Sequence, residues 1–271
     1  MYSDLKGKVA IVTGSASGIG KVIAKILVRE GVITVVADID VENGKRTVEE
    51  LNREGPSKNI FIHTDVSERK SVESMVDEVV KRFGKIDILV NNAGINIPRL
   101  LVDPKGKQEI TDEIWEKIVS INQKGTYLCT QAVVRHMIKR GNNGVIINVS
   151  SESALEGSHG QSVYAGTKAA IYSYTRSWAK ELGRFNIRVV GVAPGILEPT
   201  SMRTYEYEKA LAYTRGITVD ELRSAYKNLS IPLRRVGRLE EVAEVVCFLA
   251  SEKASYITGT VINISGGKSR A

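Results

Sequence analysis

The sequence contains few cysteine, histidine and aromatic residues. Among 271 residues there are two cysteines and three histidines, and aromatic residues make up 6%. Cys129 and Cys247 lie far apart in apolar, helix-like patterns with no CxxC spacing, so we interpret them as buried free thiols. His63, His136 and His159 are scattered and have no second ligand three or four residues away. These absences argue against a disulfide scaffold and against a metal centre.

Long apolar runs and blocks of like charge are also missing. No stretch approaches the 18 or so apolar residues that a membrane span needs, and a strand-like run that begins by Val9 leaves no room for a signal peptide. The 38 Lys and Arg residues exceed the 31 Asp and Glu residues, but the excess is dispersed rather than gathered on one helix. We therefore expect a soluble cytoplasmic protein without a nucleic-acid or membrane partner, and an anionic metabolite remains open.

What the sequence does contain is a repeated strand-helix cycle. Residues 8–13 form an apolar run without alternation, which predicts a strand buried on both faces. A glycine-rich turn and a helix over 20–30 follow, and the cycle then recurs. We predict further strands at 33–38, 59–66, 85–94, 144–151, 186–194 and 258–265, and further helices at 41–54, 68–83, 111–140, 163–182 and 239–250. Because helices separate the strands, the sheet should be parallel, as in a Rossmann-type, doubly wound α/β fold of seven strands in one domain, 1–271.

The turn over residues 14–20 has the spacing GxxxGxG. It lies between the first strand and the first helix, where backbone N–H groups and the helix N-terminus can hold a pyrophosphate. A purely structural turn is the alternative. Asp38 ends the second strand, where its carboxylate can accept both ribose hydroxyls of adenosine. Neither Ser17 nor Ile39 brings a cation for a 2'-phosphate, so NAD is favoured over NADP.

Four motifs in order along the chain carry a family resemblance. The turn TGSASGIG, NNAG at 91–94, Ser151 and Tyr164-x-x-x-Lys168 together resemble the classical short-chain dehydrogenase/reductase family over essentially the whole chain. The resemblance implies a catalytic set of Asn122, Ser151, Tyr164 and Lys168. With the glycine turn and Asp38, it implies cofactor contacts at Gly14, Ser17, Gly18, Ile19, Gly20, Asp38, Asp65, Val66, Asn91, Ala93, Gly94, Tyr164, Lys168, Pro194 and Gly195. Thr200 is the nearest match to the family's threonine after Pro-Gly.

The chemistry of these residues is consistent with that assignment. Tyr164 and Lys168, four apart on a helix, share one face. A phenol with a pKa near 10 needs about 4 kcal/mol of stabilisation to lose roughly 3 pKa units, which an ammonium and the positive nicotinamide ring can supply. Ser151 can donate to the substrate oxygen. Asn122 interrupts a helical pattern before Gly125, which suggests a local distortion and a water near Lys168. An ordinary half-buried tyrosine is the alternative for Tyr164.

The segments around this set predict a polar substrate. Residues 151–157 read SESALEG, and Glu152 with Gln161 could hydrogen-bond a polyol, whereas a lipid would leave them unpaired. The alternative is that Glu152 and Glu156 face solvent. Two segments, 95–110 and 196–237, are expanded. The second, with helix-like pieces at 204–214 and 219–228, is a candidate substrate lid.

Basic residues in these segments and in the tail could hold a phosphate. They are Arg99, Arg203, Arg215, Lys268 and Arg270, of which we favour Arg203, Lys268 and Arg270. The variable segments resemble the branch of the family that acts on sugar-alcohol phosphates, which implies reversible NAD-linked oxidation of D-sorbitol 6-phosphate at C2 to D-fructose 6-phosphate. The expected substrate contacts are Arg99, Ser151, Glu152, Gln161, Tyr164, Arg203, Lys268 and Arg270.

Other functions stay open at this point. Within the family, the alternatives are an unphosphorylated polyol dehydrogenase and a 3-oxoacyl thioester reductase. Outside enzymes, the chain could be a cofactor-binding redox regulator. The family resemblance also implies a homotetramer, formed by the helices at 111–140 and 163–182 and by the last helix and strand.

Overall fold

The computed structural model describes residues 2–55, 58–141, 143–227 and 231–269. Its centre is a seven-stranded sheet with the order β3-β2-β1-β4-β5-β6-β7, in which every neighbouring pair is parallel. The strands are β1 (Val9–Thr13), β2 (Ile33–Asp38), β3 (Ile60–His63), β4 (Ile88–Asn91), β5 (Gly144–Val149), β6 (Ile187–Pro194) and β7 (Val261–Ile264). The predicted Rossmann-type sheet is confirmed, although several strands are shorter than their apolar runs.

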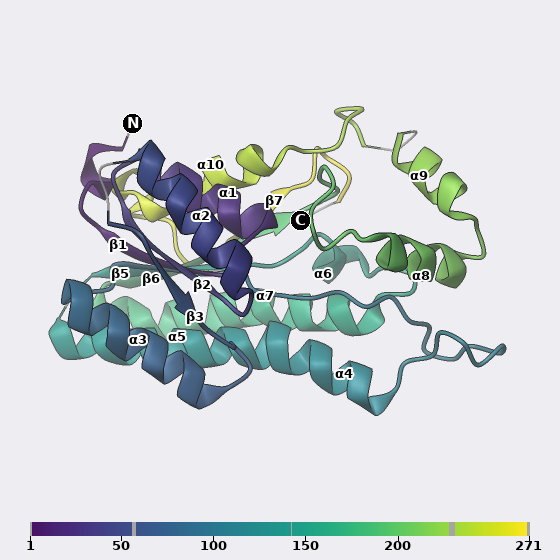
Figure 1. The fold of residues 1–271 in the computed structure, drawn as a ribbon, viewed down its shortest axis with the longest axis horizontal. Helices are drawn as coiled ribbons and strands as arrows, with labels where there is room; N and C mark the ends of the chain where they lie inside the picture. Colours follow the sequence, from purple (N-terminus) through teal and green to yellow (C-terminus); the bar gives the residue numbers. More distant parts are fainter. Residues whose placement is uncertain (1, 56–57, 142, 228–230, 270–271) are drawn as a thin grey trace.

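Helices cover both faces of this sheet (Figure 1). One face packs on α1 (Gly18–Arg29), α2 (Val41–Glu54) and α10 (Leu239–Ala250). The other packs on α3 (Arg69–Phe83), α5 (Gly125–Arg140) and α7 (Ser162–Leu182). Successive strand residues point to opposite faces, so Ala10 and Val12 enter the first core while Val9 and Ile11 enter the second. This double burial explains why the strand sequences are apolar without alternation.

The long helix predicted over 111–140 is divided. It consists of α4 (Asp112–Val119), a π-helical turn (Ser120–Lys124) and α5. The predicted distortion at Asn122 is thereby confirmed, and π-helical turns of this kind occur often at functional sites. Gly125 follows the π-helical turn, and its backbone lies close to Val66. A Cβ on Gly125 would lie 2.8 Å from Cγ2 of Val66. The interrupted helix thus runs against the segment that follows β3.

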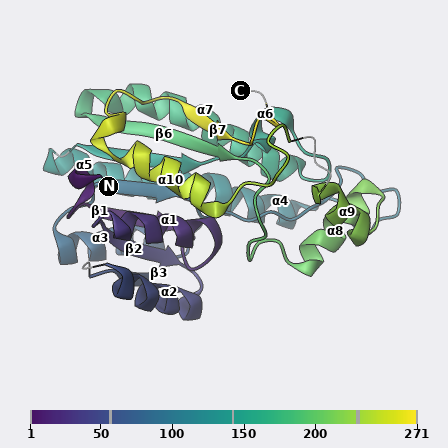
Figure 2. The same ribbon diagram turned by 90° about the horizontal axis from the view of Figure 1, so that it is seen from above.

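Two expanded segments lie together at one end of the molecule. The helices α8 (Tyr205–Arg215) and α9 (Val219–Lys227) lie beyond the end of the sheet in both views (Figures 1 and 2), with a small apolar core of their own. The loop 95–110 lies beside them, and the Tyr213 hydroxyl donates to Asp103 over 2.9 Å. Both segments therefore stand where the strands have their carboxyl ends, the edge at which α/β sheets bind ligands. No helix in the described ranges is long and apolar enough to span a bilayer.

Candidate active site

A cleft of about 480 Å³ runs along the carboxyl ends of the strands. It lies at β1 and β4, where the strand order reverses direction, which is the expected ligand position in a doubly wound sheet. The sequence-predicted residues that line it are Gly14, Ser17, Gly18, Ile19, Asp38, Asp65, Val66, Ala93, Gly94, Ser151, Tyr164, Lys168, Pro194 and Gly195, together with Thr200. Most of the predicted cofactor and catalytic residues are therefore brought to one surface.

The glycine turn has the shape that close approach of a phosphate requires. Gly14 has φ +64°, and a Cβ there would lie 2.7 Å from Cα of Ala93. A Cβ on Gly20 would lie 2.3 Å from the Gly14 carbonyl oxygen, so Gly20 lets α1 pack on the turn rather than lining the cleft. Asn92 holds the turn in place, since its amide donates to the carbonyl oxygens of Thr13 and Gly14, each over 2.9 Å. Sequence reasoning missed Asn92, although it stands in NNAG.

Asp38 is oriented by two backbone N–H groups. Ala16 donates to one carboxylate oxygen over 2.8 Å and Asp40 donates to the other over 3.0 Å. Each oxygen keeps lone pairs for further donors, and the carboxylate lines the cleft beside Ile39. The open glycine turn at one point and this oriented carboxylate at another fit the pyrophosphate and the adenosine ribose of NAD.

Asn91 takes a different position from the one expected. Its amide donates to the Thr130 hydroxyl and to Asn148, both over 2.9 Å. The side chain is buried in the sheet region and does not line the cleft. Asn91 therefore ties β4 to β5 and α5, while the cleft wall is formed by the residues that follow it.

Ser151, Tyr164 and Lys168 meet on the floor of the cleft. The Lys168 ammonium donates to the Val149 carbonyl over 2.8 Å and lies 5.7 Å from the centre of the Tyr164 ring. Ser151 Oγ accepts hydrogen bonds from the Ser153 amide and hydroxyl, over 3.2 and 3.0 Å. The Ser151 proton is left to donate toward the cleft or toward Tyr164.

Burial governs the protonation of this group. It raises the pKa of Tyr164, and the nearby charge of Glu152 adds to the rise, while a hydrogen bond with Ser151 opposes it. Burial lowers the pKa of Lys168 to about 8. The protein groups alone thus favour the neutral phenol, and further positive charge beside Tyr164 is needed to favour the phenolate.

Asn122 is fully buried behind the cleft and does not line it. Its side-chain oxygen accepts from the Ile95 amide over 2.8 Å, and its amide donates to the Ile95 carbonyl over 2.9 Å and to the Thr167 hydroxyl over 3.2 Å. A Cβ on Gly94 would lie 3.3 Å from Asn122 Oδ1 and 3.4 Å from Lys168 Nζ. Asn122 therefore positions the chain beside Lys168.

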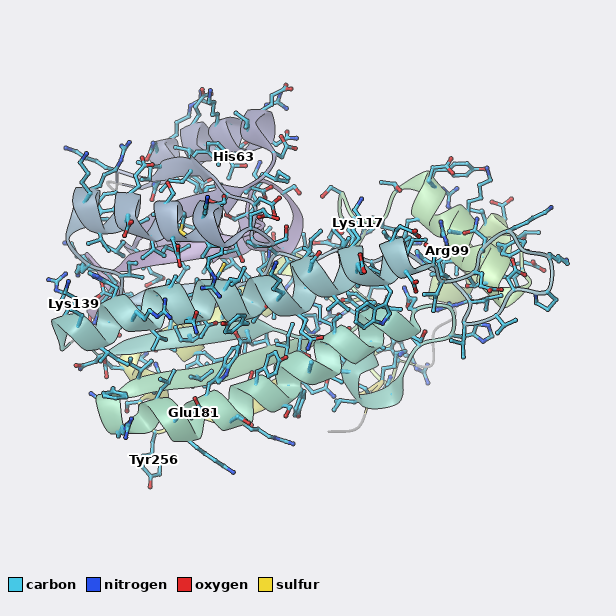
Figure 3. All side chains as sticks on the ribbon, turned by 90° about the horizontal axis from the view of Figure 1, so that it is seen from below. His63, Arg99, Lys117, Lys139, Glu181 and Tyr256 are labelled. Atoms are coloured by element: carbon cyan, nitrogen blue, oxygen red, sulfur yellow. The ribbon has the colours of Figure 1, made fainter. Side chains whose placement is uncertain are left out.

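A second pocket of about 250 Å³ adjoins the cleft and shares Ser151, Tyr164 and Gly195 with it. The predicted substrate residues Glu152, Gln161, Arg203 and Lys268 line it, as do Tyr207 and Arg215. Arg99 does not line the pocket, although it lies at the same end of the molecule as α8 and α9 (Figure 3). Arg270 lies outside the described residues. Within the described ranges, no group of three or more His, Cys, Asp or Glu residues could hold a metal ion.

Glu152 is a buried carboxylate that lines the second pocket, with 9% of its surface exposed. Its Oε1 atom accepts from the Lys268 ammonium over 2.9 Å. Its Oε2 atom is buried and has no hydrogen-bond partner among the described residues. Burial raises the pKa of Glu152, and Glu156 adds to the rise, while Lys268 opposes it. Glu152 therefore adds a charged, hydrogen-bonding group to the wall of the second pocket.

Gln161 and Arg203 are held by the predicted lid. The Gln161 amide donates to the Tyr207 hydroxyl over 2.7 Å. Arg203 donates to Glu208 over 2.8 Å, and Arg223 pairs with the other oxygen of Glu208 over 2.7 Å. Glu208 is 5% exposed. Burial would raise the pKa of Glu208, but the two arginines lower it, so this carboxylate stays ionised between them.

Comparison with known proteins gives consistent results. The family model described as short chain dehydrogenase matches residues 8–210. The chain is 53% identical to sorbitol-6-phosphate 2-dehydrogenase of Klebsiella pneumoniae, across 99% of this chain and 98% of that protein. It is 42% identical to a 3-oxoacyl-[acyl-carrier-protein] reductase of Thermotoga maritima, across 97% and 98%. Among solved structures, NAD+-bound xylitol dehydrogenase superposes with a TM-score of 0.87 at 28% identity, covering 97% of this chain and 99% of that one.

Proposed function

The chain belongs to the short-chain dehydrogenase family as an NAD-dependent oxidoreductase, and we propose that its substrates are D-sorbitol 6-phosphate and D-fructose 6-phosphate, interconverted at C2. The observation that supports a polyol is the polar wall next to Ser151, where Glu152, Gln161 and Lys268 line the second pocket. Substrate hydroxyls can form hydrogen bonds with the polar groups of Glu152 and Gln161 on this wall. The 53% identity to a sorbitol-6-phosphate 2-dehydrogenase supports the same choice.

In the proposed mechanism, the Tyr164 phenolate accepts the proton of the C2 hydroxyl while the C2–H bond breaks. Bound NAD supplies the acceptor for the hydride that leaves C2. Ser151 donates a hydrogen bond to the same oxygen, which orients the alcohol and later the ketone. Lys168 lies beside Tyr164, and its positive charge stabilises the phenolate. In the reverse direction, Tyr164 returns the proton to the ketone oxygen.

The same pocket disfavours the thioester reductase alternative. An acyl chain placed against Glu152 would remove water from the Glu152–Lys268 pair without offering either group a hydrogen bond. Gln161 and Lys268 add further polar atoms to the wall. Asp38 disfavours NADP because its carboxylate would face the 2'-phosphate. We therefore place the 3-oxoacyl activity second, despite the 42% identity to such a reductase.

A substrate panel tests this proposal. NAD reduction should be measured under identical conditions with sorbitol 6-phosphate, sorbitol, mannitol 1-phosphate and xylitol, and NADH or NADPH oxidation with a 3-oxoacyl thioester. We expect the highest kcat/KM with sorbitol 6-phosphate. Faster turnover of the thioester would overturn the choice of a polyol, and no turnover of any substrate would favour a redox regulator.

The proposed function also includes a substrate lid, a cellular location and an oligomeric state. Residues 196–237 would act as the lid over the substrate, because α8 and the loop before it line the second pocket. We place the enzyme in the cytoplasm as a homotetramer. The location follows from the sequence pattern, which predicts neither a membrane span nor a signal peptide, and the homotetramer follows from the family resemblance.

A further inference from the structure

The second pocket has an uneven distribution of charge. Three cations line it: Arg203, Arg215 and Lys268. Lys268 lies 2.9 Å from Glu152 and 3.5 Å from Glu156, so that group carries a net negative charge. Arg203 shares Glu208 with Arg223, so two guanidinium groups contact one carboxylate there. The second pocket therefore has an acidic end, near Lys268 in the C-terminal tail, and a basic end, formed by arginines of the predicted lid.

Arg215 adds to the basic end and has no ion pair with any residue in the described ranges. It is exposed on α8, yet it lines the pocket. The two cations that we favoured from the sequence and can place, Arg203 and Lys268, are by contrast already paired with carboxylates. A guanidinium without a carboxylate partner can bind a phosphate without first breaking an internal pair.

The spacing along α8 places Arg215 on the side of the helix that faces the second pocket. Tyr207, Leu211 and Arg215 are four residues apart in turn, so they share one helix face, and all three line the pocket. Tyr207 accepts from Gln161, which stands just before the helix that carries Tyr164. At a rise of 1.5 Å per residue, Arg215 lies about 12 Å further along the helix axis. This face of α8 thus begins at Tyr207, near the helix α7 that carries Tyr164, and ends at the positively charged Arg215.

We propose that Arg215 binds the phosphate of the substrate and that the two charged ends orient the molecule. This inference rests on the proposed function. Oxidation at C2 leaves one carbon on one side of the reacting centre and four carbons with the phosphate on the other. The short side faces Glu152, which lines the pocket and can accept a hydrogen bond from a hydroxyl. The long side faces α8, because the acidic end repels the dianion and the basic end attracts it.

The test compares phosphorylated and unphosphorylated substrates in Arg215→Ala. We expect KM for sorbitol 6-phosphate to rise about tenfold, the scale of a single charge-assisted contact open to solvent. KM for sorbitol and for NAD should stay unchanged, and Arg215→Lys should recover part of the loss. Inorganic phosphate should compete with sorbitol 6-phosphate in the wild type and compete more weakly in Arg215→Ala.

Lys209→Ala is the matched control, because Lys209 is an exposed cation on the same helix that does not line the pocket. It should leave every KM unchanged. An unchanged KM for sorbitol 6-phosphate in Arg215→Ala, or an equal rise for sorbitol, would overturn the phosphate assignment while the proposed function stands. A wild type that does not oxidise sorbitol 6-phosphate would overturn the proposed function itself.

Discussion

Tyr164 occupies surroundings that oppose its ionisation, since burial and the charge of Glu152 both raise its pKa. Its proposed role is to exchange a proton with the substrate oxygen, which phenylalanine cannot do. We expect Tyr164→Phe to lower kcat by about 100-fold or more, the scale of a lost general base. NAD affinity should stay nearly unchanged, because the glycine turn and Asp38 are untouched, and cofactor titration measures it. Substantial turnover by this variant would remove Tyr164 from the mechanism.

Lys168 gives a prediction about stability against pH. Burial lowers its pKa from 10.5 to about 8, which at 1.36 kcal/mol per pKa unit is about 3 kcal/mol of cost to the folded state at neutral pH. Between pH 8 and 10.5 the unfolded chain holds a proton here that the folded chain lacks, so wild-type stability rises with pH across this window. Below pH 8 both states are protonated and the cost is constant.

Lys168→Met removes this dependence. Between pH 7.5 and pH 10.5, the free energy of unfolding of the wild type should rise relative to that of the variant. The rise should be most of the about 3 kcal/mol that burial of the Lys168 charge costs. Urea unfolding of both proteins at the two pH values measures it. A difference that does not change with pH would show that Lys168 is not desolvated in the folded protein.

The sequence predicts the chemistry of the site better than its electrostatics. Spacing places Tyr164 and Lys168 on one helix face, and motif order places Ser151 beside them, because both relations are local or fixed by the fold. The partner of Lys268 could not be predicted, since Glu152 lies 116 residues away. Glu208 is only five residues from Arg203, but nothing in its neighbourhood indicates that it is buried. Which cation is left without a carboxylate is therefore a property of tertiary structure.

At the scale of elements, the helix and strand order follows from apolar periodicity, while the ends do not. The run at 59–66 pairs only over Ile60–His63, because the chain then leaves the sheet toward the cleft at Asp65 and Val66. The short helix α6 (Ser153–Glu156) was not predicted, since four residues are too few for a helical period. The π-helical turn was predicted as a distortion because Asn122 breaks the pattern of its neighbours.

A side-chain contact joins the loop 95–110 to the helix α8, because the Tyr213 hydroxyl lies within hydrogen-bond distance of both carboxylate oxygens of Asp103. Burial would raise the pKa of Asp103, but backbone N–H groups of Gln108, Lys105 and Lys107 and the Tyr213 hydroxyl lower it to about 2. The carboxylate is thus ionised near neutral pH, and the hydroxyl of Tyr213 donates to a charge, which makes the bond stronger than one between neutral groups.

Removing that hydroxyl should loosen the lid. We expect Tyr213→Phe to raise KM for sorbitol 6-phosphate about fivefold to tenfold, since part of the contact energy is lost, with little effect on KM for NAD. Limited proteolysis should cut within 196–237 sooner than in the wild type. Tyr205→Phe, an exposed tyrosine on the same helix, is the control and should behave as wild type. An unaltered KM together with unaltered proteolysis would contradict the coupling of the two segments.

At the scale of the whole molecule, exposed aromatic side chains on one side of the sheet predict assembly into an oligomer. Trp115 on α4 and Tyr127 on α5 are exposed by 51% and 38%, and Tyr174 stacks on Trp178 along α7 with ring centres 4.9 Å apart. Aromatic side chains are enriched in protein interfaces, and these helices lie on one side of the sheet (Figure 1). We expect light scattering at micromolar concentration to give four times the chain mass of 29.7 kDa. The mass of a single chain would contradict the homotetramer.

The contact between Glu208 and its two arginines has a consequence for protein engineering. Glu208 joins the loop after β6, the helix α8 and the helix α9 through Arg203 and Arg223, while Tyr207 and Tyr213 join α8 to Gln161 and Asp103. A graft of 196–237 onto a relative would leave these buried groups without partners unless residues 97–110 and 158–161 were moved with it. Exchange of substrate preference between relatives should thus succeed when these three segments are transplanted as one block and fail when the lid is transplanted alone.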